Sequence, residues 1–180
     1  MVIFFQQQFN KSINMKQNYI NECKIIQQNS TYTAEAHHHM AIRFKRLAFW
    51  FEVVPAVCSA ITGTLVSSGI VGNWLLIFTV MSSILTAITA ILNPDKTYQQ
   101  HLEAAKDFTA LKHDARFLHE SASTTMSDES FAIAVENLHN KYNDLIKNVP
   151  PTDSSSFDKA QAIIQKGTHE PDKDKNGLIK

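Results

Sequence analysis

Cysteine, glycine and proline are sparse in this 180-residue sequence, which contains two cysteines, five glycines and five prolines. The two cysteines, Cys23 and Cys58, are too few for a disulfide framework and agree with a reducing compartment. The sequence also lacks a glycine-rich phosphate loop, a Ser-His-Asp set and a Cys-x-x-Cys pair. We therefore expect a protein that is not an enzyme, with no catalytic residues, no cofactor and no metal site.

Charge is absent from Val53 through Leu92, a run of forty residues without Asp, Glu, Lys, Arg or His. A bilayer core about 30 Å thick requires roughly 20 apolar residues per helix, so this run has the length of two spans. Its middle, Ser67 to Asn73, combines two glycines with small polar residues, as a turn between helices does. We expect transmembrane helices near 51–70 and 74–93. A helical hairpin buried in a soluble protein is the alternative.

Basic residues flank the uncharged run. Arg43, Lys45 and Arg46 precede the first span and Lys96 follows the second, whereas the turn has no charge. Because positive residues stay on the cytoplasmic side, we expect a multi-pass membrane protein with both termini cytoplasmic. Residues 1–46 carry six basic and two acidic side chains. A net charge of +4 beside an apolar segment favours the lipid bilayer as partner, and no direct binding of nucleic acid is expected.

The charged parts of the sequence also have helical periodicity. Helices are expected over 19–50, 94–121, 127–148 and 156–166, between a variable extension, 1–18, and a flexible tail, 167–180. In the second of these helices a heptad-like seam consists of His101, Ala104, Phe108, Leu111, Ala115 and Leu118. The helix expected over 127–148 has an apolar seam of similar spacing and should pack antiparallel to it. This seam consists of Phe131, Val135, Leu138, Tyr142 and Leu145. The predicted fold class is an all-α integral membrane protein, a two-span hairpin flanked by long cytoplasmic helices, and oligomeric.

The dipeptide Asn93-Pro94 joins the second span to the next helix. Asn93 is a good N-cap, and Pro94 suits the first helical position, where its missing N–H costs nothing. The pair therefore ends one helix and starts another with almost no linker. We expect it to transmit movement of the following helices to the second span.

Hydroxyl side chains recur on one face of the second span, and Asn93 continues them to its end. The stripe consists of Thr79, Ser82, Ser83, Thr86, Thr89 and Asn93. Small polar residues let membrane helices pack closely, and Ser59, Gly63 and Ser67 match them on the first span. The other interpretation is an aqueous lumen lined by several copies. Because two helices cannot enclose water, a pore requires a homo-oligomer.

Two residues near the start of the first span are candidates for a hinge. Glu52 is either an interfacial carboxylate near Arg46 or a buried gating charge. Pro55 frees the carbonyl of Phe51 and is expected to kink the helix. With Pro94, they form the predicted hinge or gating set.

Three further motifs carry weak signals for metal binding. His37, His38 and His39 point in different directions around a helix and do not converge on one ion. Two Glu-x-x-His pairs, Glu35 to His38 and Glu136 to His139, are typical of di-iron bundles, which need further inward carboxylates. The segment DKDKNG, 172–177, matches half of a calcium loop and lacks the bidentate glutamate, so an Asx-type turn is its simpler interpretation.

Taken together, the layout resembles a known family. The parts that carry the resemblance are "YTAEAHHHMAIRFKRLAFW" before the first span, "VCSAITGTL" in it, "ILNP" at the end of the second, "HLEAAKDFTAL", "SFAIAVENLHNKYNDLI" and "SFDKAQAII". Over about residues 19–166 this pattern is similar to the SLATT family of two-transmembrane effectors, associated with SMODS nucleotidyltransferases and SLOG sensors. Its most specific residues are Pro94, His101, Ala105, Phe108 and Leu111.

The resemblance implies a function in bacterial anti-phage conflict systems. Members of the family are expected to oligomerise into a pore or disrupt the membrane, causing growth arrest or death, when a sensor or nucleotide-signal-producing protein encoded nearby activates them. The family supplies no catalytic residues. The alternative is a non-conducting membrane anchor or scaffold whose cytoplasmic helices recruit a partner.

Overall fold

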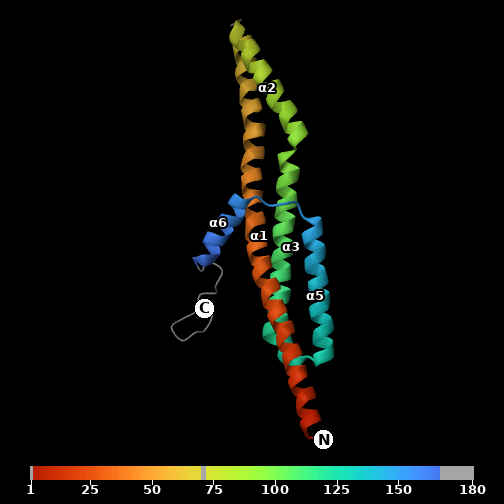
Figure 1. Cartoon of the computed structure of the whole chain (residues 1–180). Coiled ribbons are helices and arrows are strands. Elements are labelled where there is room, and N and C mark those ends of the chain that lie inside the picture. Colours follow the sequence, from red (N-terminus) through yellow and green to blue (C-terminus); the bar gives the residue numbers. More distant parts are fainter. Residues whose placement is uncertain (1, 70–71, 167–180) are drawn as a thin grey trace. The chain divides into compact units, whose positions relative to one another are not determined.

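The computed structural model describes residues 2–69 and 72–166, and all regular structure in this part of the chain is helical (Figure 1). This confirms the predicted all-helical class. The main helices are α1 (Val2–Ser67), α2 (Asn73–Leu92), α3 (Pro94–Phe117), α5 (Asp128–Asn148) and α6 (Ser154–Gln165). A π-helical turn, Leu118–Ala122, and the short α4, Ser123–Thr125, follow α3.

The chain divides into two compact units. One, which we call the bundle unit, contains residues up to His39 and from Glu103 onward; the other, the hairpin unit, is Met40–Leu102. Helices α1 and α3 each contribute residues to both units. No proline or glycine precedes Pro55, which accounts for the uninterrupted course of α1 through residues that the sequence analysis divided among an extension, a flanking helix and a span.

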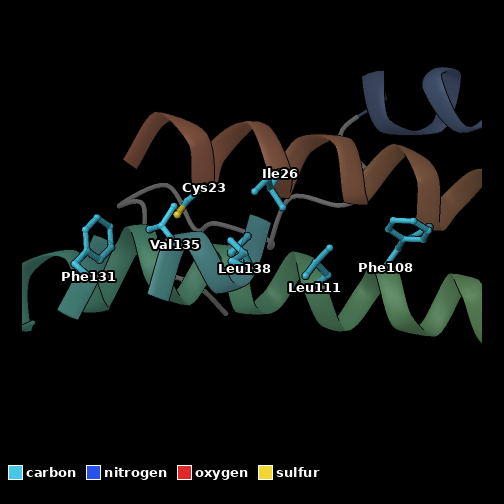
Figure 2. Packing of buried hydrophobic residues seen from close by; sticks show 9 residues of the cluster. Cys23, Ile26, Phe108, Leu111, Phe131, Val135 and Leu138 are labelled. Carbon is cyan, nitrogen blue, oxygen red and sulfur yellow. The ribbon is translucent and has the colours of Figure 1, made fainter. Parts of the chain in front are cut away.

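The bundle unit is built around one apolar core shared by α1, α3 and α5 (Figure 2). His37 of α1 contacts Phe108 of α3, and Gln27 of α1 contacts His119 in the π-helical turn just after α3, so α1 and α3 are antiparallel. The contact between Phe108 and Tyr142 pairs α3 with α5. The buried residues of this core are Cys23, Ile26, Ala34, Phe108, Leu111, Ala115, Phe131, Val135 and Leu138. Helix α6 contacts α1 where Phe157 stacks on Tyr32, with 6.1 Å between ring centroids.

Side-chain caps set where the last two helices begin. The hydroxyl oxygen of Ser127, the expected cap, accepts a hydrogen bond from the Ser130 N–H at 3.3 Å, and α5 starts one residue later. The carboxylate of Asp153 accepts from the Ser156 N–H at 2.8 Å. Helix α6 therefore begins at Ser154, two residues before the expected start at 156.

The hairpin unit contains the two apolar stretches of the chain. In the described part of the chain, two helices are long and apolar enough to cross a membrane, with best-window mean hydropathies of 1.6 and 2.3. Only 6% and 0% of the residues in these windows are buried. A hairpin in the core of a soluble protein is covered by the rest of the chain, so these exposures disfavour that alternative. Gly69 supplies the left-handed backbone of the turn between the spans, at φ 73°.

Candidate functional site

The two apolar helices meet along a narrow contact in which Cys58 of α1 is buried. Ser59 and Ser82 mark one edge of this contact, with their hydroxyl oxygens 3.3 Å apart. The Ser82 hydroxyl also donates to the carbonyl of Pro55 at 3.4 Å. Proline lacks a backbone N–H but keeps a carbonyl that accepts hydrogen bonds. Through this carbonyl Pro55 takes part directly in the contact between α1 and α2.

The predicted hydroxyl stripe of α2 divides between two environments. Ser82 and Thr89 are half-buried toward α1, whereas Thr79, Ser83 and Thr86 are exposed. The hydroxyls of the three threonines and of Ser83 donate to the carbonyl four residues earlier, at 2.7 to 2.9 Å. Such bonds satisfy a hydroxyl without water, so these side chains are compatible with an apolar environment.

Small and hydroxyl residues gather on one side of the hairpin. Successive residues of a helix are about 100° apart around its axis. Thr79, Ser83 and Thr86 therefore lie roughly a quarter-turn away from the face of α2 that contacts α1. They lie on the same side of that face as Ser82, which is at its edge. Because the helices are antiparallel, Ser59 and Gly63 of α1 lie on the same side. We call these five exposed residues the hydroxyl face. The opposite side carries large exposed apolar residues, Val57, Ile61, Ile77, Met81 and Ile88.

Two of the predicted hinge residues lie at the start of the first span. Glu52 is exposed and precedes Ser59 by two helical turns, so it lies on the same side of α1 as the hydroxyl face. Pro55 is half-buried inside α1, which continues as an α-helix through it. The geometry brings both residues to the side of the hairpin where Ser59 meets Ser82.

The third hinge candidate, Pro94, is buried at the junction of α2 and α3. Asn93 adopts the left-handed conformation, φ 40° and ψ 61°, and its N–H donates to the Thr89 carbonyl at 2.9 Å. Its side-chain oxygen accepts a hydrogen bond from the Lys96 N–H at 3.2 Å. One residue therefore caps the end of α2 and the beginning of α3.

The predicted seam of α3 is occupied within the chain. In the hairpin unit, His101 is buried and stacks on Phe44, with 5.6 Å between centroids. In the bundle unit, Phe108 is 0% exposed and contacts His37 at 5.9 Å and Tyr142 at 6.5 Å between centroids. Leu111 is buried in the same core and Leu118 is partly buried against it. These contacts use the seam inside one subunit.

The hydrophobic pattern of the sequence does not reveal the contribution of α1 to the core. Five of the buried residues of α1, Cys23, Ile26, Ser30, Ala34 and His37, recur at spacings of 3, 4, 4 and 3, and Ala36 is buried as well. The spacing is helical, but only Ile26 is a large apolar residue, which hides the pattern from a search based on hydrophobicity.

Two groups near this core have perturbed pKa values. Burial raises the pKa of the Cys23 thiol to about 11, and the negative charge of Glu22 adds to the effect. Burial lowers the pKa of His119, whose ring nitrogen Nε2 is hydrogen-bonded to the side-chain oxygen of Gln27. Both groups are therefore held in their neutral forms near pH 7.

The candidate metal motifs do not converge in the structure. His139 of one Glu-x-x-His pair is exposed, with Nδ1 3.0 Å from a carboxylate oxygen of Glu22 on α1. His39 lies 3.6 Å from Glu35. Across residues 2–69 and 72–166 no three His, Cys, Asp or Glu side chains form a group suited to a metal ion. The DKDKNG segment, 172–177, lies outside the described residues.

Comparison with known proteins identifies the two-span architecture. No curated protein and no solved structure matches the chain. A family described as the SMODS and SLOG-associating 2TM effector domain family 4 matches residues 17–175. The match includes both apolar stretches and all of α2, α3, α5 and α6, together with α1 from residue 17 onward, and it extends beyond the 19–166 expected from the resemblance. The chain is therefore a member of the SLATT family, whose domains are two-transmembrane effectors.

Proposed function

We propose that the protein is a membrane effector of a bacterial anti-phage conflict system. A partner sensor, or a nucleotide signal made by a protein encoded nearby, activates it. The activated chains assemble through their hairpins and permeabilise the inner membrane, which arrests growth or kills the cell. Membership of the effector family supports the class of function, and the arrangement of the hairpin supports the mode of action.

The observation that carries the proposal is the two-sided hairpin. Large apolar residues on one side suit contact with lipid chains. The hydroxyl face on the other side lets a second copy approach closely, as small residues do in membrane helix pairs. If several copies form a ring and the hydroxyl face of each points toward the central axis, these faces line a polar lumen. Glu52 lies on this side, so the ring also carries carboxylates, which favour cations.

The junction at Asn93-Pro94 supplies the mechanical connection. The bonds that Asn93 makes to Thr89 and Lys96 leave no flexible linker between α2 and α3. A change in the helices that follow α3 therefore moves α2 directly. In this proposal both termini are cytoplasmic, because Arg43, Lys45, Arg46 and Lys96 flank the spans and the turn has no charge.

A non-conducting scaffold is the second candidate, and one observation favours it. The exposed hydroxyls of Thr79, Ser83 and Thr86 are already bonded to backbone carbonyls. They therefore need no water, and the hydroxyl face serves equally well for dry packing between copies.

The deciding experiment measures membrane potential with a dye in cells expressing the chain with its genomic neighbours. The wild type depolarises cells on activation, and Ser83→Leu with Thr86→Leu, which fills the hydroxyl face, abolishes depolarisation. Met81→Leu with Ile88→Leu, on the apolar side, is the matched control and retains it. Thr86→Val keeps the shape and removes the hydroxyl, so it preserves close packing and weakens a wet lumen. Growth arrest without depolarisation would refute the pore and leave the scaffold.

A further inference from the structure

A groove lies between α1 and α5 in the bundle unit, and its floor reaches the edge of the core. A cavity of about 450 Å³ adjoins one of about 260 Å³, and the two share Tyr19, Glu129 and Ala132. An ion pair between Lys16 and Asp128, at 2.7 Å, and a hydrogen bond between Glu22 and Nδ1 of His139, at 3.0 Å, connect the two helices, and both helices run in the same direction. Parallel neighbouring helices therefore form the walls, over about 10 Å of α1 and about 16 Å of α5.

The floor of the groove is apolar and partly open. Val135 and Tyr19 belong to the core or pack against it, whereas Ile133 is 55% exposed and Met15 is 52% exposed. Together the cavity and these two exposed side chains offer apolar surface that the non-polar side of an amphipathic partner can cover.

The rim of the groove is acidic. Four carboxylates, Glu22, Asp128, Glu129 and Glu136, stand against one ammonium, that of Lys16, a net charge of −3 with His139 neutral. Lys16 and His139 contact Asp128 and Glu22. Within the described part of the chain, Glu129 and Glu136 take part in no ion pair. Their charges are available to a ligand.

We propose that this groove binds a basic amphipathic helix of a partner protein. A fourth helix lying between α1 and α5 extends the three-helix core, and its apolar side covers Ile133 and Met15. Lys or Arg residues along its edges face Glu129 and Glu136. A nucleic acid or a surface of anionic lipids is repelled by the acidic rim. A second copy brings an identical acidic groove, so groove-to-groove pairing is also repulsive.

The proposal concerns recruitment and holds whether or not the hairpins conduct ions. The test uses the full chain in nanodiscs of zwitterionic phosphatidylcholine, which minimise electrostatic attraction of a cationic probe to the lipid. The probe is a fluorescein-labelled helical peptide of about 14 residues, with Leu at positions i, i+3, i+4 and i+7 and Lys elsewhere. Two control peptides are used. A scrambled peptide of the same composition lacks the amphipathic pattern, and a peptide with Glu in place of Lys keeps the pattern and reverses the charge.

Fluorescence anisotropy then compares matched variants. Glu129→Gln with Glu136→Gln removes two rim charges, and Glu103→Gln with Asp107→Asn removes two from exposed positions of α3. The rim variant and Ile133→Ser should each weaken binding about fivefold, as loss of exposed ion pairs or of one apolar contact implies, and the α3 variant should not. Equal weakening by both charge variants, or equal binding of the scrambled or acidic peptide, would overturn the proposal. So would a change in oligomeric state confined to the rim variant, which would make the groove a self-contact.

Discussion

Replacing Asn93 by alanine should destabilise the hairpin unit by about 2–3 kcal/mol. Asn93 is held in the left-handed conformation, which costs a non-glycine residue about 1–2 kcal/mol and which asparagine tolerates better than alanine. Alanine also lacks the side-chain oxygen that accepts the Lys96 N–H, and loss of such a cap costs about 0.5–2 kcal/mol. The variant cannot avoid this cost by joining α2 and α3 into one continuous helix, because a proline inside a helix costs about 3 kcal/mol or more.

Asn93→Gly separates the two contributions. Glycine adopts the left-handed conformation freely and replaces a capping side chain at a cost of only a few tenths of a kcal/mol, so this variant should stay within about 1 kcal/mol of the wild type. Both variants are measured by titrating the protein in mixed micelles with SDS and following the fluorescence of Trp50 and Trp74, the two tryptophans of the chain. Equal destabilisation by alanine and glycine, or a loss below about 0.5 kcal/mol for alanine, would refute the double-cap argument.

Three further predictions concern the bundle unit. Phe108→Ala should lower the free energy of unfolding by about 3–5 kcal/mol in a denaturant titration, because the ring is wholly buried. Phe117 is exposed, so Phe117→Ala should change it by less than about 0.5 kcal/mol. Similar losses of stability in the two variants would contradict the assigned core. In a Cys58→Ala background, Cys23 should resist iodoacetamide at pH 8 until the protein is unfolded, whereas an exposed Ile25→Cys thiol should react at once. Since folding raises the pKa of Cys23 from 9.0 to about 11, its contribution to stability should be complete below pH 9 and lost as the pH rises through about 11. Folding lowers the pKa of His119 from 6.5, so its contribution is present above pH 6.5 and is lost as the pH falls. Its ring resonances in NMR should titrate at lower pH in the folded protein than in urea-unfolded protein, and a midpoint that does not rise on unfolding would contradict burial.

The strongest features of the fold were predictable because each depends on a long or chemically specific signal. A run of forty uncharged residues allows few structures other than two membrane helices, and the family match agrees with that interpretation. The large apolar residues of the α3 seam, such as Phe108 and Leu111, predict which face of the helix is buried. Capping residues predict where helices begin, as Ser127 does for α5.

Other features were not predictable because their signals are weak or non-local. The buried stripe of α1 contains Cys23, Ser30 and His37, which a hydrophobicity pattern does not recognise. The acidic groove needs Glu22 and Glu136 side by side, although more than a hundred residues separate them in sequence. For the hydroxyl stripe, helical spacing places its members on one face but does not determine which of them meet α1. The contact of Ser82 with Ser59 depends on how the two helices pack.

The order of the helices along the chain has a consequence for biosynthesis. Cys23 of α1 packs in a core with Phe108 of α3, so the ribosome must make both membrane spans before α1 has anything to pack against. At about 5–20 residues per second this delay is roughly 4–17 s. During that time a strongly apolar α1 surface would be prone to aggregation or to mistaken insertion beside the true spans. A buried stripe in which Ile26 is the single large apolar residue, beside Cys23, Ser30, Ala34 and His37, tolerates exposure to water during the delay, and the other large apolar residues of the core are made later, on α3 and α5.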